Sequence, residues 1–158
     1  MTSKKARDSE VTMTELVLPN DTNLIGNLLG GRLMNWVDIA GALAASRHCR
    51  NVVATVEVDS IDFKHPIKRG NMVELKAKLT WVGTTSMEVK VTVYAEDLYS
   101  AERKLASEAY VVFVSIDRFG KPIPAPKLEL ETEEEKIAWE EALERRNHRI
   151  KKANKAKE

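Results

Sequence analysis

The chain has 158 residues, with 25 Lys and Arg against 24 Asp and Glu, one Cys, and a 43% share of hydrophobic residues. This length suits one domain, the near-neutral charge offers no basic field for nucleic acid or an anionic membrane, and a single Cys cannot form an internal disulfide. Because only 6% of the residues are aromatic, the core is modest, and oligomerisation is one way to add buried surface.

The first half of the chain is predicted to contain a short strand followed by a long helix. Residues 1–10 are polar, lack the apolar region of a signal peptide and are expected to be disordered. Residues 11–18 alternate imperfectly but are rich in β-branched side chains, which favours a strand. After a turn-rich segment over 19–23, apolar residues recur at steps of three and four across 32–49. This last pattern predicts a buried helix, whose Ala and Gly residues allow other elements to pack closely.

After residue 51 the hydrophobic period changes to two, which predicts four long strands joined by tight loops. The alternating segments cover residues 52–63, 73–81, 87–95 and 105–116. In the first of them the alternation places Thr55, Glu57 and Asp59 on one side, and its phase becomes ambiguous at Ser60, which is typical of a β-bulge. One helix followed by an antiparallel meander predicts an α+β fold in which a sheet wraps around the helix.

The tail that follows the proline-rich segment 118–126 is predicted to be a separate, highly charged helix. Its acidic residues cluster near the start and its basic residues near the end, which matches the helix dipole. Residues 127–158 carry nine charges of each sign, so a nucleic-acid-binding tail is disfavoured and docking on the domain or on a neighbouring subunit is expected. No run reaches about 18 apolar residues, so no membrane span is predicted and we expect a cytoplasmic protein.

Asp38 is the residue most in need of a chemical reason, because it stands alone in an apolar helix and an unpaired buried carboxylate is costly. It is either exposed or bonded to a loop, or it is a general base or nucleophile in an apolar cleft. Asn23 by itself suits a turn or cap, but its amide can also orient a water or donate to an oxyanion. Gly30 and Gly31 precede the helix, where free N–H groups polarise a carbonyl.

Other catalytic and metal-binding patterns are weak or absent in the sequence. His65 stands in a loop with no second His or Cys at ligand spacing, so no metal site is predicted. His48 and Cys49 are adjacent on a helix and point in different directions, which disfavours a nucleophile beside its base. There is no G-x-S-x-G elbow and neither glycine-rich phosphate-binding pattern, which disfavours serine-hydrolase chemistry and nucleotide hydrolysis.

Residues 18–41, LPNDTNLIGNLLGGRLMNWVDIAG, closely resemble the opening of hotdog-fold acyl-CoA thioesterases of the cytosolic acyl-CoA hydrolase type. DFKHP over 62–66 and VGTTSMEV over 82–89 also agree, and the resemblance spans about residues 11–125. It implies a hotdog fold, an antiparallel sheet of five to six strands wrapped around a long helix. It also implies a homo-oligomer, a dimer with a continuous sheet or a homohexamer of three dimers. No cofactor is implied, since CoA is part of the substrate.

By this resemblance, Asn23 and Asp38 occupy the positions of the family's catalytic Asn and Asp, which different subunits of a dimer contribute to one site. Asp38 would activate a water or attack the thioester directly, while backbone N–H groups of Gly30 and Gly31 polarise its carbonyl. CoA phosphates require positive charge and hydrogen-bond donors. The residues that we expect to supply them are Lys64, Lys68, Arg69, Thr84, Thr85 and Ser86.

The resemblance therefore predicts hydrolysis of fatty acyl-CoA to a free fatty acid and CoA. The expected organisation is a disordered N-terminus over 1–10, a hotdog thioesterase domain over 11–125 and a charged helical extension over 126–158. Two alternatives stay open. A hydroxyacyl-thioester dehydratase of this fold needs a catalytic His, for which only His65 and His48 are candidates. A non-catalytic acyl-CoA sensor would usually carry a DNA-binding module, for which the 158 residues leave no space.

Overall fold

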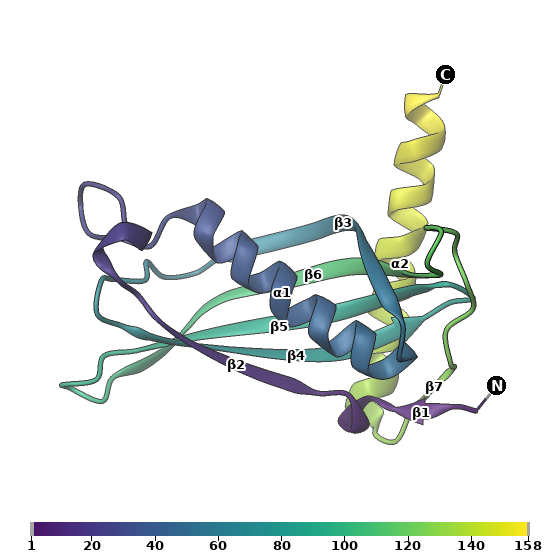
Figure 1. Cartoon of the computed structure of the whole chain (residues 1–158), viewed down its shortest axis with the longest axis horizontal. Coiled ribbons are helices and arrows are strands. Elements are labelled where there is room, and N and C mark those ends of the chain that lie inside the picture. Colours follow the sequence, from purple (N-terminus) through teal and green to yellow (C-terminus); the bar gives the residue numbers. More distant parts are fainter. Residues whose placement is uncertain (1, 158) are drawn as a thin grey trace.

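A long helix, α1, lies across one face of a five-stranded antiparallel sheet in this computed structural model, which describes residues 2–157 (Figure 1). The sheet has the strand order β2-β4-β5-β6-β3, so β2 and β3 are its edges. A second helix, α2, crosses the opposite face. The elements are η2 (Pro19–Asp21), α1 (Gly30–Cys49), α2 (Glu133–Ala156), β2 (Val11–Leu16), β3 (Val52–Phe63), β4 (Met72–Val82), β5 (Ser86–Glu96) and β6 (Arg103–Ile116). The expected α+β architecture, a sheet around a long helix, is confirmed.

α1 packs closely on the sheet because the residues of its inner face are small. Ala40 and Ala44 are fully buried there. A Cβ atom added at Gly41 would lie 2.9 Å from the ring of Phe113 on β6, which is closer than side chains pack in proteins. A larger residue at this position would push the helix off the sheet. The small side chains predicted for this helix thus determine how closely Asp38 approaches the strands.

β3 contains two β-bulges, seen as register shifts between Thr55 and Glu57 and between Val58 and Ser60. The second confirms the bulge predicted at Ser60, whereas the first was not predicted. The expectation that Thr55, Glu57 and Asp59 share one side is wrong. Thr55 faces α1 and bonds to it, while Glu57 and Asp59 face α2 and bond to that helix. The reason is that each bulge inserts one residue and reverses the alternation beyond it.

The N-terminal segment is ordered over residues 4–8, so the expectation of disorder over 1–10 is wrong there. β1 (Lys4–Lys5) pairs in parallel with β7 (Leu128–Glu129), and η1 (Ala6–Asp8) follows it. Ala6 is buried in the core, and Arg7 forms an ion pair with Glu131 at 3.2 Å. Partners more than a hundred residues away leave no local pattern that predicts such pairing. Residue 1 of this segment and residue 158 of the C-terminal extension lie outside the described residues.

α2 docks on the outer face of the sheet of its own chain. Its N-cap is Thr132, whose hydroxyl accepts a hydrogen bond from the Glu135 backbone N–H at 3.1 Å. Trp139 of the helix packs at a tilt against Trp81 of β4, with ring centroids 6.0 Å apart. Between residues 2 and 157, neither α1 nor α2 combines the length and the apolar character that crossing a membrane requires.

His48, near the end of α1, is fully buried and joins the helix to the segment between β6 and β7 that contains Pro126. Its Nε2 lies 2.7 Å from the carbonyl oxygen of Pro126 and therefore carries the hydrogen, because a carbonyl only accepts. Its Nδ1 has no hydrogen-bond partner among the described residues. Burial lowers the pKa of His48, against an opposing effect of the Pro126 carbonyl, and the nearby Lys4 ammonium lowers it further. The imidazole is thus held neutral.

We expect the free energy of unfolding to fall as the pH drops below about 6.5, because His48 takes up a proton in the unfolded chain before it does so in the folded one. Its contribution is complete above that pH, and one proton gives a slope of at most about 1.4 kcal/mol per pH unit. Denaturant unfolding between about pH 7.5 and 5.5 measures this slope. His48→Gln, which keeps a donor for Pro126, should flatten it, whereas the exposed control His148→Gln should not. Equal slopes in all three proteins would contradict this assignment.

Candidate functional site

Asp38 projects from the middle of α1 toward β3, where the Thr55 hydroxyl donates to its Oδ1 atom at 2.7 Å. The carboxylate is half-buried, and its Oδ2 atom accepts no hydrogen bond from any of the described residues. Asp38 is thus both bonded and accessible: Thr55 binds one of its carboxylate oxygens, and the other oxygen is open. A carboxylate fixed by one hydrogen bond, with a second oxygen free, is suited to accept a proton from water or to attack a carbonyl.

Thr55 is the residue of this pair that sequence reasoning missed. Threonine is common in strands, and the alternation of β3 places Thr55 on the same side as two carboxylates rather than toward the helix. Only the unpredicted bulge after Thr55 reveals its contact with Asp38. The sequence carries no signal of this contact, because it depends on the bulge.

Asn23 lies in a tight loop before α1 and is exposed. Its Oδ1 atom accepts hydrogen bonds from the backbone N–H groups of Ile25 and Asn27, each at 3.1 Å. Gly26 adopts the left-handed conformation, φ 81°, that this turn requires. The prediction that Asn23 is a turn residue is therefore correct for its side-chain oxygen. The amide nitrogen donates to none of the described residues and remains available to a ligand or a second chain.

Gly30 and Gly31 form the first turn of α1. Leu29 precedes the helix and offers no side-chain acceptor, so the first N–H groups have no capping partner. The space beside both glycines is open, with nothing within 4 Å of where a Cβ would stand. A carbonyl oxygen can therefore approach this helix end, where the dipole favours negative charge. The glycines were expected just before the helix and are in fact its first residues.

A single thioester cannot touch Asp38 and the glycine N–H groups of the same chain. Eight residues separate Gly30 from Asp38, and a helix rises 1.5 Å per residue, so the two lie about 12 Å apart along α1. Asn23 belongs with the glycines, because its loop leads directly into this helix end. The structure therefore places these residues in two groups, Asn23 with Gly30 and Asp38 with Thr55, which we call half-sites.

The surface around the half-sites is apolar and open. Leu24 is fully exposed and Ile25 is 80% exposed at the tip of the Asn23 loop. A groove of about 960 Å³ runs between the second half of α1 and the start of β3, lined by apolar residues such as Leu43 and by polar ones such as Arg47 and Arg50. β3 has a hydrogen-bonded neighbour on one side only. An apolar loop tip and an open strand edge are features of a surface that another copy of the chain covers.

Two of the six residues expected to bind CoA lie beside Asn23. Lys68 and Arg69 line a cavity of about 430 Å³ together with the Asn23 loop, and the Arg69 N–H donates to the Gly26 carbonyl at 2.9 Å. Neither side chain forms a salt bridge with another residue of the described chain. Lys64 lies near them but is bound to Asp62 at 2.8 Å, which raises the pKa of the Lys64 ammonium. Lys68 and Arg69 are thus the two cations of this group that form no salt bridge within the described chain.

Thr84, Thr85 and Ser86 lie at the opposite end of the sheet. Thr84 and Thr85 form the turn before β5 and Ser86 is its first residue, whereas Lys68 and Arg69 precede β4, whose first residue pairs with the last of β5. The 11 residues of β5 separate the two ends by about 36 Å. Carbonyl oxygens of Thr84 and Thr85 are bonded to backbone N–H groups of the chain. Within one chain the structure therefore does not bring the six residues together.

The histidines offer no alternative centre. His48 is buried against Pro126 at the C-terminal end of α1, and His65 is exposed in the loop after β3. No group of three or more His, Cys, Asp or Glu residues suited to a metal ion occurs within residues 2–157. Asp38 is thus the acidic group best placed for chemistry.

Residues 25–102 match the family described as "Thioesterase superfamily". The chain is 43% identical over 143 residues to an uncharacterized acyl-CoA thioester hydrolase, YkhA, of Bacillus subtilis, covering 90% of this chain and 83% of that protein. It is 36% identical over 135 residues to the cytosolic acyl coenzyme A thioester hydrolase of Rattus norvegicus, covering 84% of this chain but only 35% of that longer protein.

Two solved structures cover nearly the whole chain. One is an apo-hexameric acyl-CoA thioesterase, with a TM-score of 0.92 and 40% identity over 97% of this chain and 98% of that one. The other is an acyl-CoA hydrolase of Staphylococcus aureus in complex with butyryl coenzyme A, coenzyme A and coenzyme A disulfide. Its TM-score is 0.90 and its identity 33%, over 98% of this chain and 94% of that one. The S. aureus hydrolase is also known with an aspartate, a threonine or an asparagine replaced by alanine.

Proposed function

The chain belongs to the thioesterase superfamily, and on this premise we propose that it hydrolyses the thioester of fatty acyl-CoA, releasing CoA and a free fatty acid. The observation that carries the proposal is the half-buried Asp38 carboxylate, with Thr55 bonded to one oxygen and the other oxygen open. A hydrolase needs such a group in contact with both water and substrate, whereas a sensor does not.

The mechanism that this geometry favours has two routes with the same participants. Thr55 holds the Asp38 carboxylate, whose free oxygen either takes a proton from the attacking water or attacks the thioester carbonyl to form an anhydride. The N–H groups of Gly30 and Gly31 stabilise the negative charge that develops on the carbonyl oxygen. Asn23 donates from its amide nitrogen to the same oxygen or to the water. The CoA thiolate leaves in both routes, and no cofactor takes part. In the second route water then hydrolyses the anhydride, which releases the fatty acid and regenerates the Asp38 carboxylate.

The assembly follows from the 12 Å separation along α1 (about eight residues at 1.5 Å). We assign Asn23, Gly30 and Gly31 of one copy and Asp38 and Thr55 of another to each site. A homodimer through the open edge of β3 supplies this arrangement twice, by symmetry. A hexamer as three such dimers is supported by the hexameric state of the similar thioesterase. A cytoplasmic location is supported by the "cytosolic" in the name of the rat relative.

CoA is assigned to the cations beside the Asn23 loop. Lys68 and Arg69 carry unpaired charges there, and Lys64 adds a third that Asp62 partly neutralises. Thr84, Thr85 and Ser86 reach this CoA only from another copy. Antiparallel pairing of two β3 edges supports this, because it sets the far end of one sheet beside the near end of the next.

The test of the proposed activity is thiol release from a panel of short- to long-chain acyl-CoA substrates, followed with a thiol reagent. We expect saturable release with at least one chain length. Addition of water to an enoyl-CoA without thiol release would instead identify a dehydratase. Tight binding of acyl-CoA with no turnover of any substrate would identify a sensor.

A further inference from the structure

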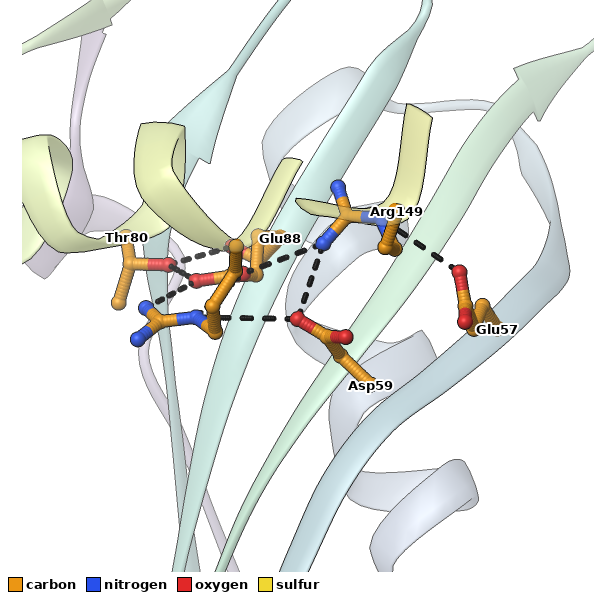
Figure 2. A network of polar contacts seen from close by, with 6 residues as sticks. Glu57, Asp59, Thr80, Glu88 and Arg149 are labelled. Carbon is orange, nitrogen blue, oxygen red and sulfur yellow. Dashed lines mark hydrogen bonds and ion pairs between the residues drawn. The ribbon is translucent and has the colours of Figure 1, made fainter. Parts of the chain in front are cut away.

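The outer face of the sheet carries a charged network that the proposed reaction does not use (Figure 2). Glu88 of β5 is fully buried there, accepts a hydrogen bond from Thr80 at 2.6 Å and is bound by Arg145 of α2 at 2.8 and 3.0 Å. The guanidinium of Arg145 also stacks 3.7 Å from the ring of Tyr110. Because a buried carboxylate needs such partners, this part of the network explains how α2 is anchored to the centre of the sheet.

Arg149, one helical turn beyond Arg145, extends the network to the edge strand β3. Its guanidinium lies 3.0 Å from Asp59 and 3.5 Å from Glu57, so it joins two carboxylates of the same strand, as Figure 2 shows. Asp59 is nearly buried, and Arg145 approaches it only to 3.9 Å. Without Arg149, Glu57, Asp59 and Glu88 would lie close together with one arginine among them, and like charges would repel.

These two carboxylates belong to the bulged segment of β3. Glu57 directly follows the first bulge and Asp59 lies within the second. The same segment begins with Thr55, whose hydroxyl bonds to Asp38 on the other face of the sheet. β3 is an edge strand of the chain, so β6 is its only strand neighbour here. Within one chain, Arg149 therefore makes the closest side-chain contacts from α2 to the bulged segment of β3.

We propose that Arg149 is a positioning residue for the thioesterase reaction: by joining Glu57 to Asp59 it fixes the bulges of β3 and thereby aims Thr55 at the Asp38 carboxylate. The inference rests on the proposed function of Asp38. It assigns to the C-terminal helix a role in the geometry of a site that it does not touch. The relevant contact is the fork of the guanidinium, which spans two carboxylates as a lysine ammonium does not.

The variant Arg149→Gln should lower kcat for acyl-CoA hydrolysis roughly tenfold, with KM changed by less than about twofold, because substrate contacts are intact while the reacting carboxylate is misaligned. Arg149→Lys, which keeps the charge but not the fork, should recover only part of this loss. The matched control is Arg146→Gln, since Arg146 lies on the same turn over the Trp81 ring and makes no contact with β3. Hydrogen exchange of residues 54–60 should speed up in Arg149→Gln and not in the control.

The decisive measurement is a double-mutant cycle with Thr55→Val. If Arg149 acts through Thr55, the double variant should turn over as slowly as Thr55→Val alone, within about twofold. Multiplied effects, or an Arg149→Gln protein that keeps the wild-type kcat, would overturn the proposal. So would a loss that parallels dissociation of the oligomer, read by size-exclusion chromatography at assay concentration. Failure of the proposed function looks different, since the wild type would then release no thiol at all.

Discussion

Asp38→Ala is expected to lower kcat/KM for thiol release from acyl-CoA by about 10²–10⁴-fold, the contribution of a positioned base or nucleophile. The Asp38 carboxylate combines an oxygen fixed by Thr55 with an open one, and Thr55 cannot replace it. The loss should appear mainly in kcat, because Asp38 meets the reacting carbonyl rather than the CoA phosphates. Steady-state kinetics with the best substrate of the acyl-CoA panel measure it.

The matched variant Asp38→Asn separates chemistry from packing. Its side chain keeps the volume of aspartate and an oxygen to accept the Thr55 hydrogen bond, but it is neither a base nor a nucleophile. It should therefore be as inactive as Asp38→Ala while its melting temperature and oligomeric state match the wild type. Glu140→Ala, which removes an exposed carboxylate from α2, should keep full activity. Activity of the Asp38→Asn oligomer within tenfold of the wild type would rule out the assignment.

The main elements of the fold could be predicted because their patterns are local. β4 and β5 alternate along most of their length, since one side chain in two meets α1, and the small residues of α1 lie close together in the chain. β1 and β7 could not be predicted, because two lysines pair with a segment more than 120 residues away. The bulge after Thr55 was missed for a related reason: an inserted residue changes the facing of its neighbours without changing the composition.

The site could be predicted only as far as the resemblance reached. It led to Asn23, which lies in the loop before α1, and to Asp38, which lies in the middle of α1, and it did not include Thr55. The sequence likewise did not predict that Ser86 and Lys68 lie at opposite ends of the sheet, because a short motif does not tell at which end it lies. Residues whose function depends on a second chain or on a bulge need the three-dimensional structure.

Mixed oligomers of Asp38→Ala and Asn23→Ala subunits are expected to regain about a quarter of the wild-type activity, although each parent is nearly inactive. A mixed dimer contains one site with both residues and one with neither, and random pairing of equal amounts makes half of the dimers mixed. Asn23→Ala alone should lose about 10²–10³-fold, as expected on removal of one oxyanion donor. The regain follows from the 12 Å rise (roughly eight residues) that keeps the two half-sites of one chain apart.

The measurement uses two affinity tags on co-expressed subunits, so that tandem purification isolates oligomers that contain both variants. The regain stays about a quarter for hexamers of randomly paired dimers and rises to about a half for isolated mixed dimers, each of which holds one complete site of two. A mixture of Asp38→Ala with Asp38→Asn is the control, because no pairing of those subunits restores a carboxylate, and it should stay at the parental level. Activity of the Asp38→Ala and Asn23→Ala mixture no greater than the sum of its parents would show that both residues act within one chain. The exposed Leu24 and Ile25 of the Asn23 loop would then need another explanation than contact with a partner subunit.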